Sequence, residues 1–312
     1  MSIQAILAST YYGEDGGSGP VADFTIEWWQ KVENAPGQNS RPWSVGLYPT
    51  QILSLSYEGL SSDFFWTNNY AQMTTAQNHV GAGWRHMAYV RSSGVVRGYI
   101  NGTQYTSNSN NSSLITDTNV PLYVGTGEIS AGMFKGYITN LHIIKGVAKY
   151  TGNFTTPTVP VIATPNSVLL LSAQSGSDPF VDSTLRHGVS SGAGTTTWNS
   201  DTPFTAASPV TILGSNPWNE GALTLYIDRT VHPDIETVQA GWTFVSGNYT
   251  ATVVSATNPD ATYRNIVLSI TSGVIDSSNG TFTQPALGGS LYFDGSSYLS
   301  YGASVDWAMD AY

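Results

Sequence analysis

The sequence predicts an all-β protein, and two observations carry that prediction. The first is composition: the chain has 32 glycines and 15 prolines, with 12% aromatic and only 10% charged residues. This mixture favours short strands joined by tight turns over helices, and its many aromatic residues exclude a disordered chain. The second is a period of two, in which apolar and polar residues alternate along many short stretches.

The first strand is expected over residues 23–32, where Phe24, Ile26 and Trp28 share one face. Asn101-Gly102 stands between two alternating runs and predicts a β-hairpin. Further strands are expected at residues 51–57, 63–67, 84–91, 122–124, 135–146 and 167–171; within 135–146, Tyr137, Thr139, Leu141 and Ile143 are placed on one face. A short helical turn and a proline-punctuated surface crossing are expected within residues 146–165, and a loop over 178–203.

The pattern divides the chain into four parts. Residues 1–22, glycine-rich after Tyr12, form an N-terminal arm, and residues 23–205 hold the first set of strands. After a linker at 206–217, strands at 222–228, 241–254 and 263–270 predict a small antiparallel β domain over residues 206–287. Residues 288–312 form a further hairpin around the polar turn 294–297.

Charge and cysteine content exclude several classes of partner. The net charge is −10 with only 11 Lys and Arg, so no basic stripe exists for nucleic acid. No apolar run is long enough to span a membrane, and the N-terminus lacks the pattern of a signal peptide. Cysteine is absent, so stability must come from packing, which suits a homo-oligomer.

Two motifs stand within the ordered series of strands: W-x-H-x-A-x-V-R from Trp84 to Arg91, and Y-x-N-G from Tyr99 to Gly102. With the strand order, they make residues 23–172 resemble the laminin-G/concanavalin A-like jelly-roll family. The resemblance is closer to versions found in bacteriophage and cyanophage structural proteins, and residues 152–160 also look like those versions. It implies a jelly-roll sandwich over residues 23–205. Residues 206–287 resemble no family that we can name.

In that family the jelly roll commonly opens with a stretch like residues 290–312 and continues into one like Asp23–Trp29; here the opener lies at the other end of the chain. The resemblance implies that these strands close a jelly roll, either in their own chain, as a circular permutation, or in a neighbouring subunit by strand exchange. Both cover a sheet edge, and closure within one chain costs less entropy. A third alternative assigns residues 288–312 to the small domain. The residues expected to make the closure or assembly contacts are Phe24, Ile26, Trp28, Leu291, Phe293, Tyr298 and Leu299.

No catalytic constellation is evident. Glycan-cleaving jelly rolls need two carboxylates close together across a cleft, whereas Asp23 and Glu27 are expected to face solvent from a half-buried strand. The chain has no G-x-S-x-G, H-E-x-x-H or P-loop motif. We therefore expect that the protein is not an enzyme.

The candidate binding residues are few. Loop aromatics Trp43, Trp66 and Tyr70 could stack on a sugar ring. Glu14 and Asp15 supply the oxygen ligands that Ca²⁺ prefers, although a solvated turn explains them as well, and no other cofactor is expected. His86 and His142 are expected to be packed, hydrogen-bonded core residues. His232, Asp234 and Glu236 alternate as metal ligands on a strand would, but Pro233 favours a turn there.

The resemblance and the composition favour a non-enzymatic virion structural protein of a tailed phage, made in the host cytoplasm, that decorates the capsid or forms part of a tail or fibre. Such a protein would act as a scaffold, binding its own copies and other virion proteins. The alternative is a lectin-like, carbohydrate-binding module for host surface polysaccharide. A glycan hydrolase is the third hypothesis, and neither nucleic acid nor membrane is an expected partner.

Overall fold

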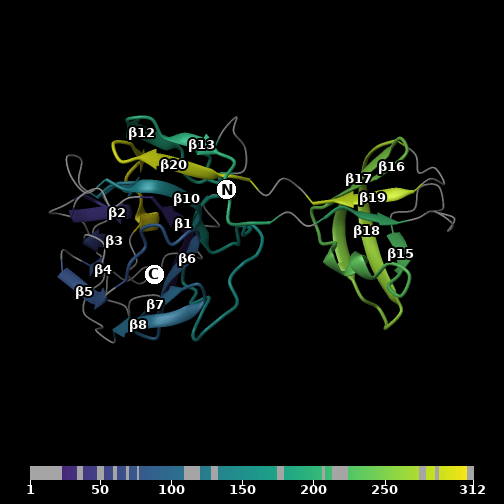
Figure 1. Cartoon of the computed structure of the whole chain (residues 1–312), viewed down its shortest axis with the longest axis horizontal. Helices are drawn as coiled ribbons and strands as arrows, with labels where there is room; N and C mark the ends of the chain where they lie inside the picture. The colour runs from purple at the N-terminus through teal and green to yellow at the C-terminus, as the bar shows by residue number, and fades with distance from the viewer. Residues whose placement is uncertain are drawn as a thin grey trace, which may run out of the picture. The chain divides into compact units, whose positions relative to one another are not determined.

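The computed structural model describes residues 23–33, 38–47, 53–58, 62–67, 70–75, 77–108, 120–127, 133–173, 179–205, 208–212, 224–273, 279–284 and 288–307. The chain divides into two compact units, each a separate β structure (Figure 1). Unit 1 comprises Met1–Pro203 together with Gly288–Tyr312, and unit 2 comprises Phe204–Leu287.

Unit 1 is a sandwich of two antiparallel sheets, as the sequence predicts. Sheet A contains β1 (Phe24–Val32), β6 (Arg85–Ser92), β7 (Val95–Ile100), β8 (Thr103–Asn108), β10 (Lys135–Lys145), β11 (Ser167–Leu171), β13 (Thr197–Asn199) and β20 (Ser290–Asp294). Its order is β13-β20-β10-β1-β6-β7-β8, and β11 also pairs with β10.

Sheet B contains β2 (Gln38–Val45), β3 (Leu53–Glu58), β4 (Ser62–Thr67), β5 (Tyr70–Thr75), β9 (Leu122–Val124), β12 (Val189–Ala193) and β21 (Tyr298–Tyr301). Its order is β12-β21-β9-β2-β3-β4-β5. Strands β2, β5 and β12 of this sheet, and β13 of sheet A, differ from the sequence-based assignment. β2 contains Pro42, a residue that argues against a strand, while β12 and β13 occupy a stretch that is expected to be a loop.

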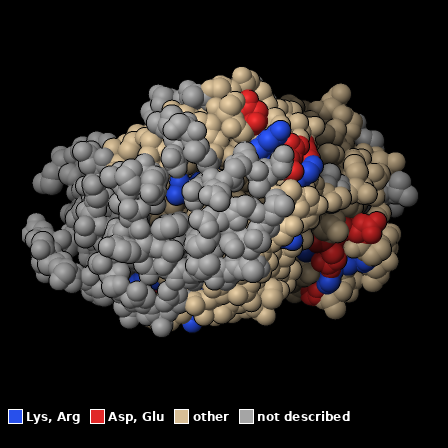
Figure 2. Space-filling view, turned by 60° about the vertical axis from the view of Figure 1, so that its left-hand side comes forward, with Lys and Arg blue, Asp and Glu red and all other residues tan. Residues whose placement is uncertain are grey.

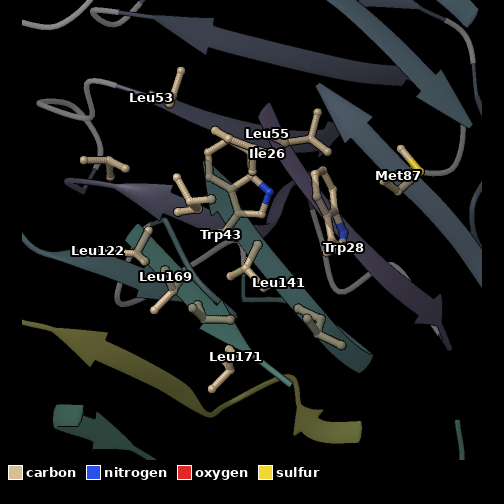
Figure 3. Packing of buried hydrophobic residues seen from close by; sticks show 14 of the residues in the cluster. Ile26, Trp28, Trp43, Leu53, Leu55, Met87, Leu122, Leu141, Leu169 and Leu171 are labelled. Carbon is tan, nitrogen blue, oxygen red and sulfur yellow. The ribbon is translucent and has the colours of Figure 1, made fainter. Parts of the chain in front are cut away.

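The hydrophobic core of unit 1 lies between the two sheets (Figure 3). Phe24, Ile26 and Trp28 of β1 point into it, as the alternation predicts. Trp28 packs edge-on against Trp43 of β2, with ring centroids 5.7 Å apart. Contacts of this kind between large buried rings add to the free energy gained by removing their surface from water.

The C-terminal strands complete both sheets of their own chain. β20 pairs with β10, where Leu291 lies opposite Ile138, and β21 pairs with β9. In Figure 1, β20 lies beside β10 although the two are far apart in the sequence. Leu291, Phe293 and Leu299 are buried in the unit 1 core, as is Trp307 of the short 3-10 helix η2 (Val305–Trp307). Of the three alternatives for this segment, the structure therefore has closure within one chain.

The turn at Asn101-Gly102 joins β7 to β8. Both residues have positive φ, 49° and 76°, which is the backbone of a type I′ turn and explains why Asn-Gly is favoured there. By contrast, residues 146–166 contain no helix. They cross the sheet as irregular chain, because their prolines remove the N–H donors that a helix needs.

Unit 2 is a six-stranded antiparallel sheet. Its strands are β14 (Val210–Ile212), β15 (Thr224–Asp228), β16 (Thr243–Ser246), β17 (Tyr249–Thr257), β18 (Tyr263–Ser272) and β19 (Gly280–Thr283), in the order β14-β19-β16-β17-β18-β15. Phe244, Tyr249 and Phe282 lie at the centre of its core. His232–Glu236 is a turn leading through the 3-10 helix η1 (Pro233–Thr237), where Glu236 binds Arg229 and Arg264.

Candidate functional site

The outer face of sheet A, directed away from sheet B, carries the polar and aromatic side chains that could act in function. Because Phe24, Ile26 and Trp28 of β1 point into the core, Glu27 and Lys31 point outward. Residues 146–166, here called the covering segment, cross one part of this face. Thr25 Oγ1 of β1 donates to Val147 O at 2.9 Å and accepts from Lys149 N at the same distance. The outer face therefore has a covered region and an uncovered region.

The covered region is organised around the carboxylate of Glu27, which is only 1% exposed. Lys149 Nζ lies 2.6 Å from Oε1, and Tyr150 Oη donates to Oε2 at 2.7 Å. His142 Nδ1 lies 3.1 Å from Oε1 and His86 Nε2 lies 3.4 Å from Oε2. One side chain of β1 thus joins β6, β10 and the covering segment. The expectation that Glu27 faces solvent is wrong, because the covering segment excludes water from it.

This network keeps Glu27 ionised. Burial by itself would raise the pKa of the carboxyl, but hydrogen bonds from His142 and His86 and the charge of Lys149 outweigh it and hold the pKa well below its usual range. Burial, together with the neighbouring Glu27 charge, raises the pKa of the Tyr150 hydroxyl. Lys149 and Glu27 form a partly buried ion pair, which explains how a carboxylate can lie under the covering segment.

Ser167, His142 and Glu27 reproduce the connections of a serine–histidine–acid triad. Ser167 Oγ lies 2.6 Å from His142 Nε2, and the other ring nitrogen faces Glu27. An ionised carboxylate only accepts, so Nδ1 carries the proton toward Glu27 and Nε2 of a neutral ring accepts from Ser167. However, Ser167 is 2% exposed, and its Oγ also accepts the N–H of Thr164 at 2.8 Å. The hydroxyl is thus out of reach of a substrate, and we assign this chain of hydrogen bonds to holding the covering segment on β10 and β11.

A pocket of about 620 Å³ opens beside this network, between β10 and the covering segment. Its polar lining comes mainly from His142, Lys149 and Tyr150, whose polar groups are already engaged. The rest is mostly valine, isoleucine and proline. An apolar wall without free polar groups gives little basis for selecting a ligand.

The uncovered region carries three half-buried aromatic rings: Tyr292 of β20, Tyr137 of β10 and Trp84, which precedes β6. The Tyr292 and Tyr137 ring centroids are 4.9 Å apart, and those of Tyr137 and Trp84 are 6.2 Å apart. With the charged side chains Lys31, Glu33 and Asp201 between and beside them, these rings form what we call the aromatic patch. Rings flanked by hydrogen-bonding groups are the surface on which a sugar can stack.

The charged groups of the aromatic patch fix its rings. Asp201 accepts from Lys31 Nζ at 2.6 Å and from Trp84 Nε1 at 3.0 Å. Burial would raise the pKa of Asp201, but these two hydrogen bonds outweigh it and lower it. Lys31 Nζ also lies over the Tyr137 ring, 4.9 Å from its centroid. The rings of the patch are thus held in place before any ligand arrives, which lowers the entropy cost of binding.

Charge is otherwise sparse on the described surface. In Figure 2, acidic and basic side chains lie next to one another in small groups, and the rest of the described surface shown is uncharged. Among the described residues, no group of three or more His, Cys, Asp or Glu side chains could hold a metal ion. In the same part of the chain, no helix is long and apolar enough to cross a membrane.

The binding residues predicted from the sequence lie in different parts of the structure, and some lie outside the described residues. Trp43 is 1% exposed and lies in the core, so its proposed role in sugar stacking is wrong: β2 turns its ring inward against Trp28. Trp66 lies in β4 and Tyr70 in β5, not in loops, but their side chains are outside the described part of the structure. Glu14 and Asp15, the calcium candidates, also lie outside the described residues. His86 and His142 are packed and hydrogen-bonded, as expected.

The residues predicted to close the sandwich meet in unit 1. Phe24, Ile26 and Trp28 lie on β1, which pairs with β10, and β10 pairs with β20 on its other edge. Leu291 and Phe293 are buried on β20, as is Leu299 on β21. Tyr298 of β21 is half-exposed beside Tyr123 of β9, with ring centroids 6.0 Å apart.

Sequence reasoning missed the aromatic patch because of a β-bulge in β10. Alternation places Tyr137 on the same face as Leu141 and Ile143, but the register with β1 shifts between Glu27 and Trp29. Asn140 has a positive φ of 53° at this point, and an extra residue there changes which face the following side chains occupy. Tyr137 therefore faces outward while Leu141 and Ile143 face the core. An Asn inside an otherwise regular strand is the one local signal of this irregularity.

Comparison with known proteins gives a family match within unit 1. Residues 12–149 match a laminin G model of the concanavalin A-like lectin/glucanases superfamily. No curated protein matches the chain.

Among solved structures, the chain is similar to a proposed carbohydrate-binding protein from Bacteroides ovatus, with 15% identity and a TM-score of 0.38, covering 49% of this chain and 46% of that one. It is also similar to domain 4 of AbnA, a GH43 extracellular arabinanase from Geobacillus stearothermophilus, in complex with arabinotriose. In this comparison the identity is 20% and the TM-score is 0.33, and the match covers 42% of this chain and 64% of that one. Domains LG4-5 of the mouse laminin α1 chain give 11% identity and a TM-score of 0.31, covering 95% of this chain and 88% of that one. The chain spans less than two thirds of the first two structures, and likenesses this distant carry no argument about a ligand.

Proposed function

Since residues 12–149 match a laminin G model of the concanavalin A-like lectin/glucanases superfamily, we propose that the protein is a non-catalytic, lectin-like module that binds carbohydrate through the aromatic patch of unit 1. The observation that carries the proposal is the arrangement of Trp84, Tyr137 and Tyr292 in one uncovered cluster with carboxylates at its edge. Apolar ring faces stack on the C–H face of a pyranose, and carboxylates accept its hydroxyl hydrogens.

The burial and ionisation of the candidate catalytic residues support binding of a glycan over its cleavage. The buried carboxylate, Glu27, is held ionised under the covering segment, and Ser167 is shielded. In the aromatic patch, Asp201 is engaged by Lys31 and Trp84, which lower its pKa. A glycosidase needs one carboxyl with a raised pKa to act as the general acid, whereas the pKa of Asp201 is lowered.

Binding to a glycan array followed by calorimetry on the best ligand tests the proposal. Trp84→Ala and Tyr292→Ala each remove one ring, and loss of one stacking contact is expected to weaken binding about fivefold to thirtyfold, at about 1–2 kcal/mol per ring. Tyr226→Ala is the matched control, since this tyrosine is 60% exposed in unit 2. Saturable binding that both patch variants retain in full, with melting temperatures unchanged, contradicts the proposal.

We further propose that the module is carried on the virion of a tailed phage, as the sequence resemblance implies, where binding host polysaccharide and contacting other virion proteins would be compatible roles. Its net charge of −10 helps to keep such a particle soluble. Mass measurement in solution tests whether the chain assembles into a homo-oligomer. Antibody labelling of purified particles tests the location, and an unlabelled particle would count against it.

A further inference from the structure

The aromatic patch contains a carboxylate that forms no ion pair with any described residue. Glu33 follows β1 and is exposed. Its Oε2 accepts a hydrogen bond from the Tyr292 hydroxyl at 3.3 Å, and the Tyr137 hydroxyl also donates to this carboxylate. Asp201 differs, because Lys31 lies 2.6 Å from it and balances its charge. Lys31 also attracts Glu33 at longer range, but one cation and two carboxylates leave Lys31, Asp201 and Glu33 with one net negative charge.

The same surface already holds an ammonium group against an aromatic ring. Lys31 Nζ lies 4.9 Å from the centroid of Tyr137, within the distance at which a cation is attracted to the ring face. Glu33 acts on both tyrosines: burial raises the pKa of Tyr137 and of Tyr292, and the negative charge of Glu33 raises each further. Tyr292 lies next to Glu33 without a cation of its own among the described contacts. The ammonium group of a ligand could therefore contact the Tyr292 ring and the Glu33 carboxylate together.

We infer that the aromatic patch prefers glycans that carry a free amine over neutral or acidic glycans, with Glu33 as the residue that determines this preference. The inference rests on the proposed function, because it supposes that a sugar stacks on the patch. The ammonium of a hexosamine would lie beside Glu33 and the Tyr292 ring, whereas a uronate or sulfate would be repelled there. Neutral sugars would bind through stacking and hydroxyl contacts alone.

Matched ligands separate this preference from stacking. Short oligosaccharides of glucosamine and of N-acetylglucosamine share their backbone and differ in the charge at the amine. Because Glu33 is exposed and an exposed ion pair is weak, we expect the free amine to bind about twofold to fivefold more tightly. Calorimetry at low and high salt measures the ratio of the two dissociation constants, and the ratio should fall as salt screens the charges. An oligogalacturonate supplies the acidic comparison and should bind most weakly.

The decisive variant is Glu33→Gln, which removes the charge but keeps an oxygen that can accept from Tyr292. In this variant the ratio is expected to fall to about one. A general attraction of cationic sugars to an acidic protein must be excluded, since the net charge is −10. Asp234→Asn is the control for that effect, because Asp234 is exposed in unit 2 and the substitution changes the net charge by the same amount.

The outcomes are distinct. If no glycan of any class binds, the proposed function fails and the inference fails with it. If the acetylated and free-amine ligands bind wild-type protein equally, glycan binding stands and the preference is overturned. If Asp234→Asn lowers the ratio as much as Glu33→Gln does, the preference comes from total charge, and the role of Glu33 is overturned.

Discussion

Replacing Glu27 by Gln should destabilise unit 1 by about 3 kcal/mol at pH 7. Four side chains face this carboxylate: Lys149, Tyr150, His142 and His86. Lys149 has a side chain 33% exposed, so water can replace its contact and its share is small. Tyr150 and His142 donate from less exposed positions, and a hydrogen bond to a charged group contributes about 1.5 kcal/mol or more, which gives about 3 kcal/mol for the two.

The effect should depend on pH, and its sign follows from Glu27 alone. The pKa of this carboxyl is lowered in the folded protein relative to its ordinary value of 4.5. Its contribution is therefore complete above the unfolded-state pKa and is lost as pH falls through and below about 4.5, because the unfolded chain then takes up the proton first. The difference between wild type and Glu27→Gln should accordingly be largest near neutral pH and shrink toward pH 3. Both proteins keep the other four facing groups.

Urea denaturation with tryptophan fluorescence at several pH values measures this difference, and hydrogen exchange at β1 and β6 assigns it to unit 1. Peptides from β17 and β18 of unit 2 serve as an internal control. Glu33→Gln is the matched substitution, since Glu33 lies just beyond the same strand and is exposed, so it should change stability by less than about 0.5 kcal/mol. A difference below about 1 kcal/mol at pH 7, or one that stays constant from pH 7 to pH 3, would refute this account of the network.

Two further stability predictions concern the turn and the C-terminal strands. In thermal denaturation, Gly102→Ala should destabilise unit 1 several times more than Gly81→Ala does. Both glycines have positive φ, so both substitutions strain the backbone. Only at Gly102 would the added Cβ also overlap the backbone of Phe154, because nothing lies within 4 Å of a Cβ at Gly81. Equal losses would show that the covering segment does not press on the turn. Phe293→Ala should lower the free energy of unfolding of unit 1 by about 3–5 kcal/mol in chemical denaturation, because this ring is fully buried in the core. A loss of stability confined to unit 2, or one no larger than that of Tyr292→Ala, would mean that the C-terminal strands are not part of this sandwich.

Local pattern was sufficient for much of the fold. Alternation at Phe24, Ile26 and Trp28 identifies the core face of β1, and Asn101-Gly102 identifies a turn that both positive φ values confirm. Strands such as β2 were missed because Pro42 breaks the local pattern while the chain still pairs with β3 and β9. Pairing energy from neighbouring strands overrides such a local signal.

The candidate site could not be predicted in the same way, because it depends on contacts between distant residues. Glu27 meets Lys149 and Tyr150, which are 122 and 123 positions away, and the sequence around each gives no sign of the others. Similarly, Tyr137 changes face through one bulged residue, and it meets Tyr292 only because β20 returns to pair with β10. Alternation states which residues share a face, but not which segment covers that face.

The covering segment, residues 146–166, determines which side chains on the outer face of sheet A are accessible to a ligand. Under this segment, a carboxylate, two histidines and a serine have the chemistry of an active site, yet all four are buried, and Lys149 of the segment pairs with the carboxylate from its solvent side. Beyond it, β1, β10 and β20 carry rings and charges that remain accessible, and the carboxylate of Glu33 there forms no ion pair with a described residue. Binding free energy can come only from groups whose surface a ligand can still remove from water. The aromatic patch, and not the more reactive network beside it, is therefore where this sheet can bind a ligand.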